Sequence, residues 1–128
     1  MKIAIVEDER LFRDVLRKTC AKDLGHEVVG EAGTGREALE VVEKARPDLV
    51  VMDVSMPGID GIEAMSRMLA KDHKLPIILN TAYATYRESF RSWSADAYVV
   101  KSSDLTELKD TIKKVLELRS RPAAPAGA

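Results

Sequence analysis

Four short apolar runs in this chain are each followed by polar residues of the kinds that make binding sites. The runs span residues 3–6, 49–52, 77–79 and 98–100, and the polar residues that follow them are Glu7, Asp8, Asp53, Thr81 and Lys101. The first run does not alternate apolar with polar residues, which is typical of a strand buried on both faces of a parallel sheet. Because all strands of such a sheet end at one edge, residues far apart in the sequence would meet there. We therefore expect a single pocket that contains three carboxylates, a hydroxyl and an ammonium.

The segments between these runs have the spacing of amphipathic helices. In residues 9–24 apolar side chains recur every three or four positions, and Gly25 follows where a helix C-cap is expected. The residues predicted to face the core there are Leu11, Phe12, Val15, Leu16 and Cys20. Strands are expected at residues 2–6, 26–32, 49–53, 76–81 and 97–100, and helices at 9–24, 34–45, after Asp60, at 83–94 and at 104–118. Since no hairpin signal is found, these units predict a doubly wound α/β fold with right-handed crossovers between parallel strands.

The length and composition restrict the class of protein. A chain of 128 residues suits one domain, and its net charge of -1 lacks the basic excess of a surface that binds nucleic acid. The single cysteine, Cys20, cannot form an internal disulfide, and no apolar run is as long as a membrane span. We expect a cytoplasmic protein that binds neither nucleic acid nor membrane. Its domain is expected at residues 1–119, followed by a flexible Pro/Ala tail or linker stub at residues 120–128.

The predicted cluster of carboxylates suggests a cation. Carboxylates that are close together repel each other, and a bound cation keeps them ionised at neutral pH. Magnesium fits best because it prefers hard oxygen ligands, whereas zinc would need cysteine or histidine ligands. A carboxylate beside the metal can also attack phosphorus, and a hydroxyl and an ammonium would then neutralise the transferred phosphoryl group. Taken singly, each residue also has a structural explanation, such as an acidic run before a helix for Glu7 and Asp8.

Four motifs in this order resemble the receiver domain of bacterial two-component response regulators. They are Val6-Glu7-Asp8, residues 52–61 (MDVSMPGIDG), Asn80-Thr81-Ala82 and residues 97–101 (AYVVK). The resemblance covers residues 1–119. It implies a flavodoxin-like, five-stranded parallel sheet in the order 2-1-3-4-5 with five flanking helices.

The resemblance also implies roles for individual residues. Asp53 would accept a phosphoryl group from a sensor histidine kinase or a phosphotransfer protein. The implied Mg²⁺ ligands are Glu7, Asp8, Asp53 and the main-chain carbonyl of Ser55, with Glu7 assisting through water. The phosphoryl oxygens would be bound by Thr81, Lys101 and the backbone of Ser55 and Ala82. Thr81 and Tyr98 would form a switch that changes the face made by the fourth helix, fifth strand and fifth helix, where a target, an output domain or a second copy docks.

Two local features of this chain bear on the chemistry that the resemblance implies. The family often places a proline in a cis peptide after the lysine, but here Ser102 follows Lys101. Tyr83 stands two residues after Thr81, a position that flanks the path of the hydrolytic water in this family. We predict that the bulk of Tyr83 slows the loss of the phosphoryl group.

Two other functions compete with a phosphorylation-controlled switch. An aspartate-nucleophile phosphatase would need a second aspartate two residues after the nucleophile as its general acid, and Ser55 stands there instead. We therefore do not expect an enzyme that turns over an external substrate. A degenerate receiver that binds partners without phosphorylation is the remaining alternative. The sequence leaves open whether the chain acts alone or is the front of a longer regulator.

Overall fold

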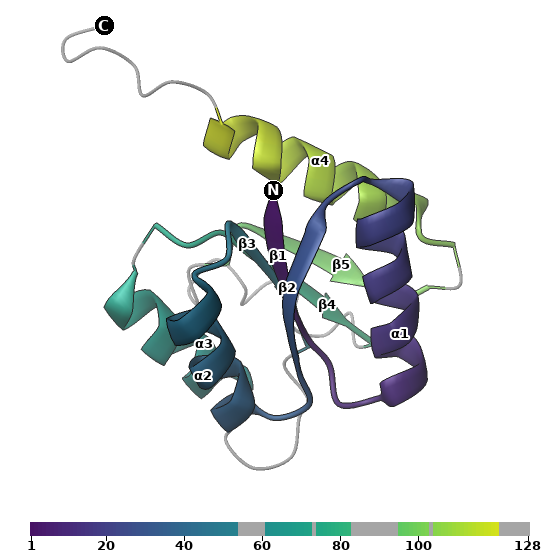
Figure 1. Ribbon diagram of the computed structural model, residues 1–128. Coiled ribbons are helices and arrows are strands. Elements are labelled where there is room, and N and C mark those ends of the chain that lie inside the picture. Colours follow the sequence, from purple (N-terminus) through teal and green to yellow (C-terminus); the bar gives the residue numbers. More distant parts are fainter. Residues whose placement is uncertain (54–60, 73, 83–94, 103, 121–128) are drawn as a thin grey trace, which may run out of the picture.

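The computed structural model describes residues 1–53, 61–72, 74–82, 95–102 and 104–120 (Figure 1). Its centre is a sheet of five parallel strands in the order β2-β1-β3-β4-β5. The strands are β1 (Lys2–Val6), β2 (Glu27–Ala32), β3 (Leu49–Met52), β4 (Ile77–Thr81) and β5 (Ala97–Val100). The predicted strand order and the doubly wound fold are confirmed.

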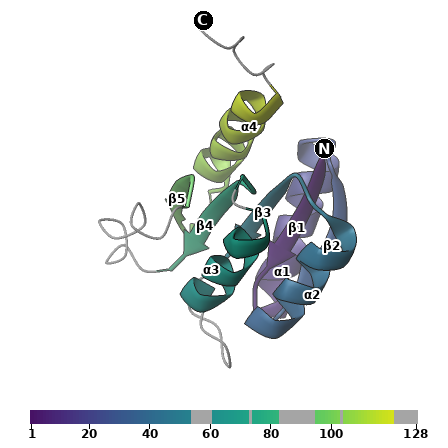
Figure 2. The same ribbon diagram turned by 90° about the vertical axis from the view of Figure 1, so that its left-hand side faces the viewer.

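The helices pack in two layers against the sheet. They are α1 (Arg10–Lys18), α2 (Gly35–Ala45), α3 (Gly61–Lys71) and α4 (Thr106–Ser120), with a π-helix, η1 (Thr19–Asp23), directly after α1. Residues of α2 and α3, such as Ala38 and Met65, share one buried cluster, and residues of α1 and α4, such as Leu16 and Ile112, share the other. Figures 1 and 2 accordingly show α2 and α3 on one side of the sheet and α1 and α4 on the opposite side. The helix predicted at residues 83–94 lies outside the described residues.

The first predicted helix differs from its expectation in two respects. Leu11 and Val15, predicted to face the core, are 76% and 42% exposed. The buried side of this segment instead follows Leu16 and Cys20, so that Leu11 and Val15 are rotated away from the sheet. In addition, the α-helix ends at Lys18, and the chain continues with the wider turns of η1 up to Asp23. The cap at Gly25 is confirmed, because its φ of 70° lies in the left-handed region that favours glycine.

Helix α2 shows how local sequence fixes the boundaries of an element. Thr34 is its N-cap, and the Thr34 hydroxyl accepts a hydrogen bond of 3.2 Å from the backbone N–H of Glu37. The helix ends at Ala45 and is capped by Arg46, which has a left-handed φ of 47° and turns the chain toward β3. Gly30 lets α2 approach β2 closely, because a Cβ atom there would lie 2.3 Å from Cγ1 of Val41.

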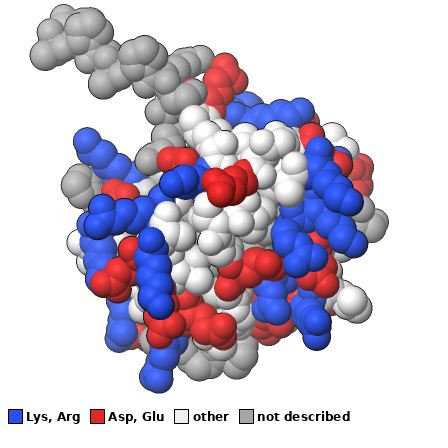
Figure 3. All heavy atoms as spheres, viewed as in Figure 1, with Lys and Arg blue, Asp and Glu red and all other residues white. Residues whose placement is uncertain are grey.

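The surface carries charges of both signs. Basic and acidic side chains intermingle over the face drawn in Figure 3. Exposed ion pairs such as Lys71–Glu43, at 3.1 Å, and Arg67–Glu63, at 2.8 Å, illustrate this mixing. In the part of the chain that the structure describes, no helix is long and apolar enough to cross a membrane.

Candidate functional site

The candidate site forms where the strand ladders continue past the ends of the regular strands. The continuing backbone hydrogen bonds are Glu7 N–H to the Ala32 carbonyl (2.8 Å), Asp53 N–H to the Val6 carbonyl (3.0 Å) and Lys101 N–H to the Thr81 carbonyl (2.7 Å). Side chains therefore keep alternating between the two faces beyond the strands. Glu7, Asp53 and Lys101 continue the rows of core residues that face α1 and α4.

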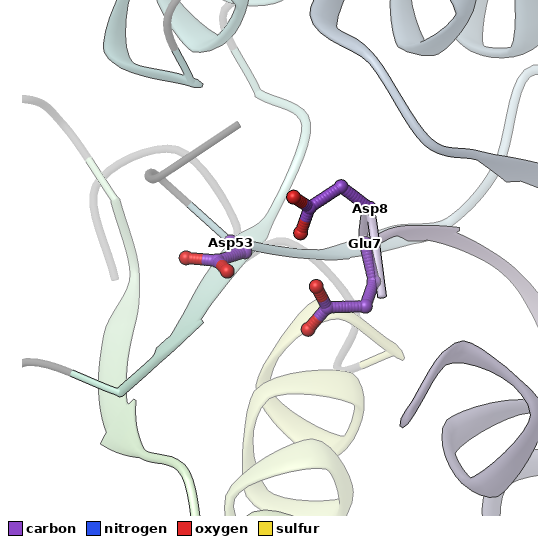
Figure 4. Close-up of side chains that lie close together, drawn as sticks. All are labelled: Glu7, Asp8 and Asp53. Atoms are coloured by element: carbon purple, nitrogen blue, oxygen red, sulfur yellow. The ribbon is translucent and has the colours of Figure 1, made fainter. Parts of the chain in front are cut away.

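Three carboxylates meet at this edge of the sheet. Glu7 and Asp8 come from the end of β1 and Asp53 from the end of β3, and one oxygen of each lies within 4.8 Å of the others. Figure 4 shows the three side chains around a common space. Glu7 and Asp53 are only 1% and 5% exposed, whereas Asp8 is exposed. The three residues offer only carboxylate oxygens, so their donor chemistry fits Mg²⁺.

Lys101 bridges two of these carboxylates. Its ammonium contacts Oε1 of Glu7 and donates to Oδ2 of Asp53 at 3.0 Å. It also lies 4.9 Å from the ring centroid of Phe12 on α1, within the range of a cation–π interaction. Burial lowers the pKa of Lys101, but its contacts with Glu7 and Asp53 outweigh burial and raise the pKa overall. Lys101 is therefore a charged partner of the site at neutral pH.

Glu7 is the carboxyl group most affected by its surroundings. The pKa of Glu7 is raised from 4.5 to about 7, mainly because the side chain is buried; the contact with the Lys101 ammonium lowers this pKa and a hydrogen bond with Asp8 raises it. Glu7 is held at its backbone carbonyl and at its carboxylate. Its carbonyl accepts a hydrogen bond of 3.0 Å from the Arg13 guanidinium, and its carboxylate accepts one of 3.2 Å from the N–H of Glu9. Near neutral pH, Glu7 is therefore poised between its neutral and charged forms.

The remaining predicted residues occupy different parts of this edge. Thr81 is fully buried at the end of β4, and Tyr98 of β5 is 6% exposed in the cluster that includes α2 and α3. Ala82 is exposed directly after β4. Ser55 and Tyr83 lie outside the described residues. The peptide between Lys101 and Ser102 is trans, because the described residues contain no cis peptide bond.

Sequence reasoning missed three residues near the site. Phe12 was expected only in the core, yet its ring also faces the Lys101 ammonium. Arg13 supports the Glu7 backbone, but in the sequence it is one arginine among several on a helix. Asn80 was read only as part of a motif, yet it is a polar side chain 3% exposed in β4. Only Asn80 had a sequence signal, a polar residue at the end of an apolar strand.

The fold and the acidic edge define a doubly wound α/β protein whose polar site lies at the carboxyl ends of its strands. The family model described as "Response regulator receiver domain" matches residues 3–113. The chain therefore belongs to the response regulator receiver domain family, and the predicted family is confirmed.

Individual relatives agree with this assignment. The chain is 36% identical over 121 residues to "Sporulation initiation phosphotransferase F" of Bacillus subtilis, covering 93% of this chain and 96% of that protein. It is 41% identical over 114 residues to "Transcriptional regulatory protein PdtaR" of Mycobacterium tuberculosis, covering 88% of this chain but only 55% of that protein. Among solved structures, response regulator TrrA of Thermotoga maritima, in complex with Mg²⁺ and BeF, superposes with a TM-score of 0.82. It is 40% identical in sequence, and the match covers 89% of this chain and 97% of that one.

Proposed function

We propose that this domain is a phosphorylation-controlled switch whose acceptor is Asp53. The observation that carries the proposal is the convergence of three carboxylates and the Lys101 ammonium at the strand ends. The phosphoryl donor would be a phosphohistidine of a sensor kinase or of a phosphotransfer protein. One oxygen of Asp53 forms the new bond to phosphorus as the N–P bond of the donor breaks, and the imidazole keeps the electron pair.

The acidic residues would bind the metal ion, and Asp53 would also attack the phosphorus atom. Glu7, Asp8, Asp53 and the main-chain carbonyl of Ser55 would hold Mg²⁺, with Glu7 acting through water. When bound, the ion neutralises the charge that builds up on the phosphoryl oxygens. Asp53 is held in place by its backbone hydrogen bond to Val6, at 3.0 Å. Burial of Asp53 keeps bulk water away from its carboxylate.

Lys101 and Thr81 would receive the transferred group. In the resting protein the Lys101 ammonium donates to Asp53, and after transfer it would donate to a phosphoryl oxygen instead. The Thr81 hydroxyl and the backbone N–H groups of Ser55 and Ala82 would bind further phosphoryl oxygens. The site thus exchanges one set of charged hydrogen bonds for another.

The readout of phosphorylation would run through Tyr98. Thr81 pairs with Val100 in the sheet and Leu79 pairs with Tyr98, so Thr81 and Tyr98 project from neighbouring strands on the same face. A shift of Thr81 toward the phosphoryl group would then change the packing of Tyr98. The altered surface would include β5 and α4, which suits a downstream target, an output domain or a second copy; the helix predicted between β4 and β5 lies outside the described residues. Among the relatives, a phosphotransferase of similar length is an example of a domain that acts alone, and a longer transcriptional regulator is an example of a domain with further chain attached.

Phosphorylation with acetyl phosphate, followed by intact mass, tests the proposal. The wild type should gain one phosphoryl group only when Mg²⁺ is present, and Asp53→Asn should gain none. Asp110→Asn, an exposed aspartate on α4, is the matched control and should behave as the wild type. No gain from acetyl phosphate or from a phosphorylated phosphotransfer protein would refute the proposal and favour a binding module that works without phosphorylation.

Thermal unfolding tests the metal ligands separately. Mg²⁺ should raise the melting temperature in a concentration-dependent way, because it binds the native state. Asp8→Asn should remove most of this shift. Without metal, the same variant should melt at a higher temperature, because one of three neighbouring negative charges is removed. An equal Mg²⁺ shift in the variant would contradict the ligand assignment.

A further inference from the structure

Asn80 is a buried polar residue that the proposed chemistry leaves without a role. It lies in β4 and is 3% exposed, and its side-chain Nδ2 has no hydrogen-bond partner among the described residues. A buried donor without a partner destabilises a fold, whereas an apolar side chain of similar size would not. The position of Asn80 in the sheet therefore needs an explanation other than stability.

The strand register places Asn80 beside the phosphoryl acceptor. Met52 pairs with Leu79, so one residue further along the ladder Asp53 stands next to Asn80. On its other side Asn80 pairs with Val99 of β5. Because Val99 belongs to the core cluster that includes α1 and α4, the alternation of strands puts Asn80 on the face that carries Asp53 and Lys101.

The ion pair between Lys101 and Asp53 crosses β4, the strand that contains Asn80. Lys101 follows β5, and its ammonium reaches Oδ2 of Asp53 after β3 at 3.0 Å. In the sheet order, β4 lies between these two strands. The Lys101 side chain therefore spans β4, and Asn80 is the β4 residue on this face that stands beside Asp53.

We propose that Asn80 is a positioning residue for the loaded state of the site. This inference rests on the proposed function. When the Lys101 ammonium moves from the Asp53 carboxylate to the transferred group, an Asp53 oxygen loses that donor. The amide N–H of Asn80, on the adjacent strand, takes over as donor to it. Because the N–H has no acceptor among the described residues at rest and gains one after loading, it stabilises the loaded state selectively.

Two nearly isosteric variants separate this role from packing. Asn80→Val removes the amide, and Asn80→Thr has the same shape as valine but restores a hydroxyl donor. The probe is beryllium fluoride with saturating Mg²⁺, a combination present in the TrrA structure. Thermal unfolding gives both the melting temperature at rest and the beryllium fluoride concentration for half-maximal shift.

The expected result has two parts. Asn80→Val should melt at or above the wild-type temperature without the probe, because a buried unpaired donor is removed. Its half-maximal beryllium fluoride concentration should rise about tenfold, the effect of losing a hydrogen bond to a charged group, and Asn80→Thr should recover part of this loss.

Other outcomes overturn the inference. Equal half-maximal concentrations in the wild type and both variants would assign Asn80 a packing role only. The same conclusion follows if Asn80→Val and Asn80→Thr load equally weakly, since the donor would then be irrelevant. If the wild type neither binds beryllium fluoride nor is phosphorylated, the proposed function fails together with this inference. If the wild type binds beryllium fluoride normally and the variants behave like it, only the inference about Asn80 fails.

Discussion

Replacing Glu7 with glutamine should make the metal-free protein more stable at alkaline pH. The pKa of Glu7 is raised from 4.5 to about 7, mainly by burial. At 1.36 kcal/mol for each pH unit, ionised Glu7 destabilises the native state by about 3 kcal/mol relative to its protonated form. Glutamine keeps the size of the protonated side chain and cannot ionise, so this destabilisation disappears in the variant.

The sign of the pH dependence follows from the two pKa values. Below the unfolded value of 4.5, Glu7 is protonated in both states and adds no pH dependence. As the pH rises toward 7, the unfolded chain releases the proton while the native state retains it, so the stability of the wild type falls. Above about 7 the native state ionises as well, and the loss of stability levels off.

Urea unfolding in the presence of EDTA measures this difference. Between about pH 5 and pH 8.5, the wild type should lose about 3 kcal/mol relative to Glu7→Gln, reduced to the extent that Lys101 relies on Glu7 as a partner. Glu40→Gln, an exposed glutamate on α2, is the matched control and should follow the wild type. The reasoning is refuted if the difference in stability between the wild type and Glu7→Gln is independent of pH, or if the wild type gains stability relative to the variant as the pH rises.

Three further predictions concern the fold and the metal site. Mg²⁺ affinity, measured by calorimetry, should increase between about pH 6 and pH 8, because Glu7 must lose its proton first, and Glu7→Gln should flatten this dependence; a flat wild-type profile would contradict the role of Glu7. Gly30→Ala should lower stability by about 1–3 kcal/mol in urea unfolding, since the new Cβ would lie 2.3 Å from Cγ1 of Val41. The double variant with Val41→Ala should recover part of that loss, and no recovery would exclude this contact as the cause. Thr34→Ala should cost about 1 kcal/mol through loss of the α2 cap, whereas Thr111→Ala, whose hydroxyl bonds within α4, should change stability little; equal losses would rule out capping as the reason.

The sequence allowed the sheet to be predicted because its strands are buried on both faces. Short apolar runs such as Leu49–Met52 stand out against amphipathic helices, and the absence of hairpin signals leaves a parallel sheet as the solution. Helix α2 was predicted at residues 34–45 and lies at Gly35–Ala45, with Thr34 as its N-cap. In each case the signal is local and needs no knowledge of packing.

The first helix was predicted less well because its spacing was read as one regular helix. Two apolar rows are compatible with this spacing, and only packing decides which of them faces the sheet. The row of Phe12, Leu16 and Cys20 does so, while Leu11 and Val15 do not. The wider turn of η1, in which Thr19 and Cys20 are buried, was also not predicted.

The residues of the acidic edge could be predicted, but their electrostatics could not. Their order at the strand ends follows from the topology of a parallel sheet. The depth of burial, which separates Glu7 from the exposed Asp8, depends on the three-dimensional surroundings. The same holds for the Lys101 bridge and for Asn80, whose Nδ2 is seen to lack a partner among the described residues only once the neighbouring side chains are in place.

In the resting domain, the Lys101 ammonium supplies the positive charge that balances the carboxylates of Glu7 and Asp53. The ammonium sits between Glu7 and Asp53, so a divalent cation must compete with a positive charge that is already part of the protein. Any anion that draws Lys101 away from these carboxylates leaves them free to hold the cation more tightly. By thermodynamic linkage the cation must then favour the anion to the same degree. If the proposed function is correct, cooperativity between the two ligands would follow from the charge arrangement alone, before any movement of the backbone.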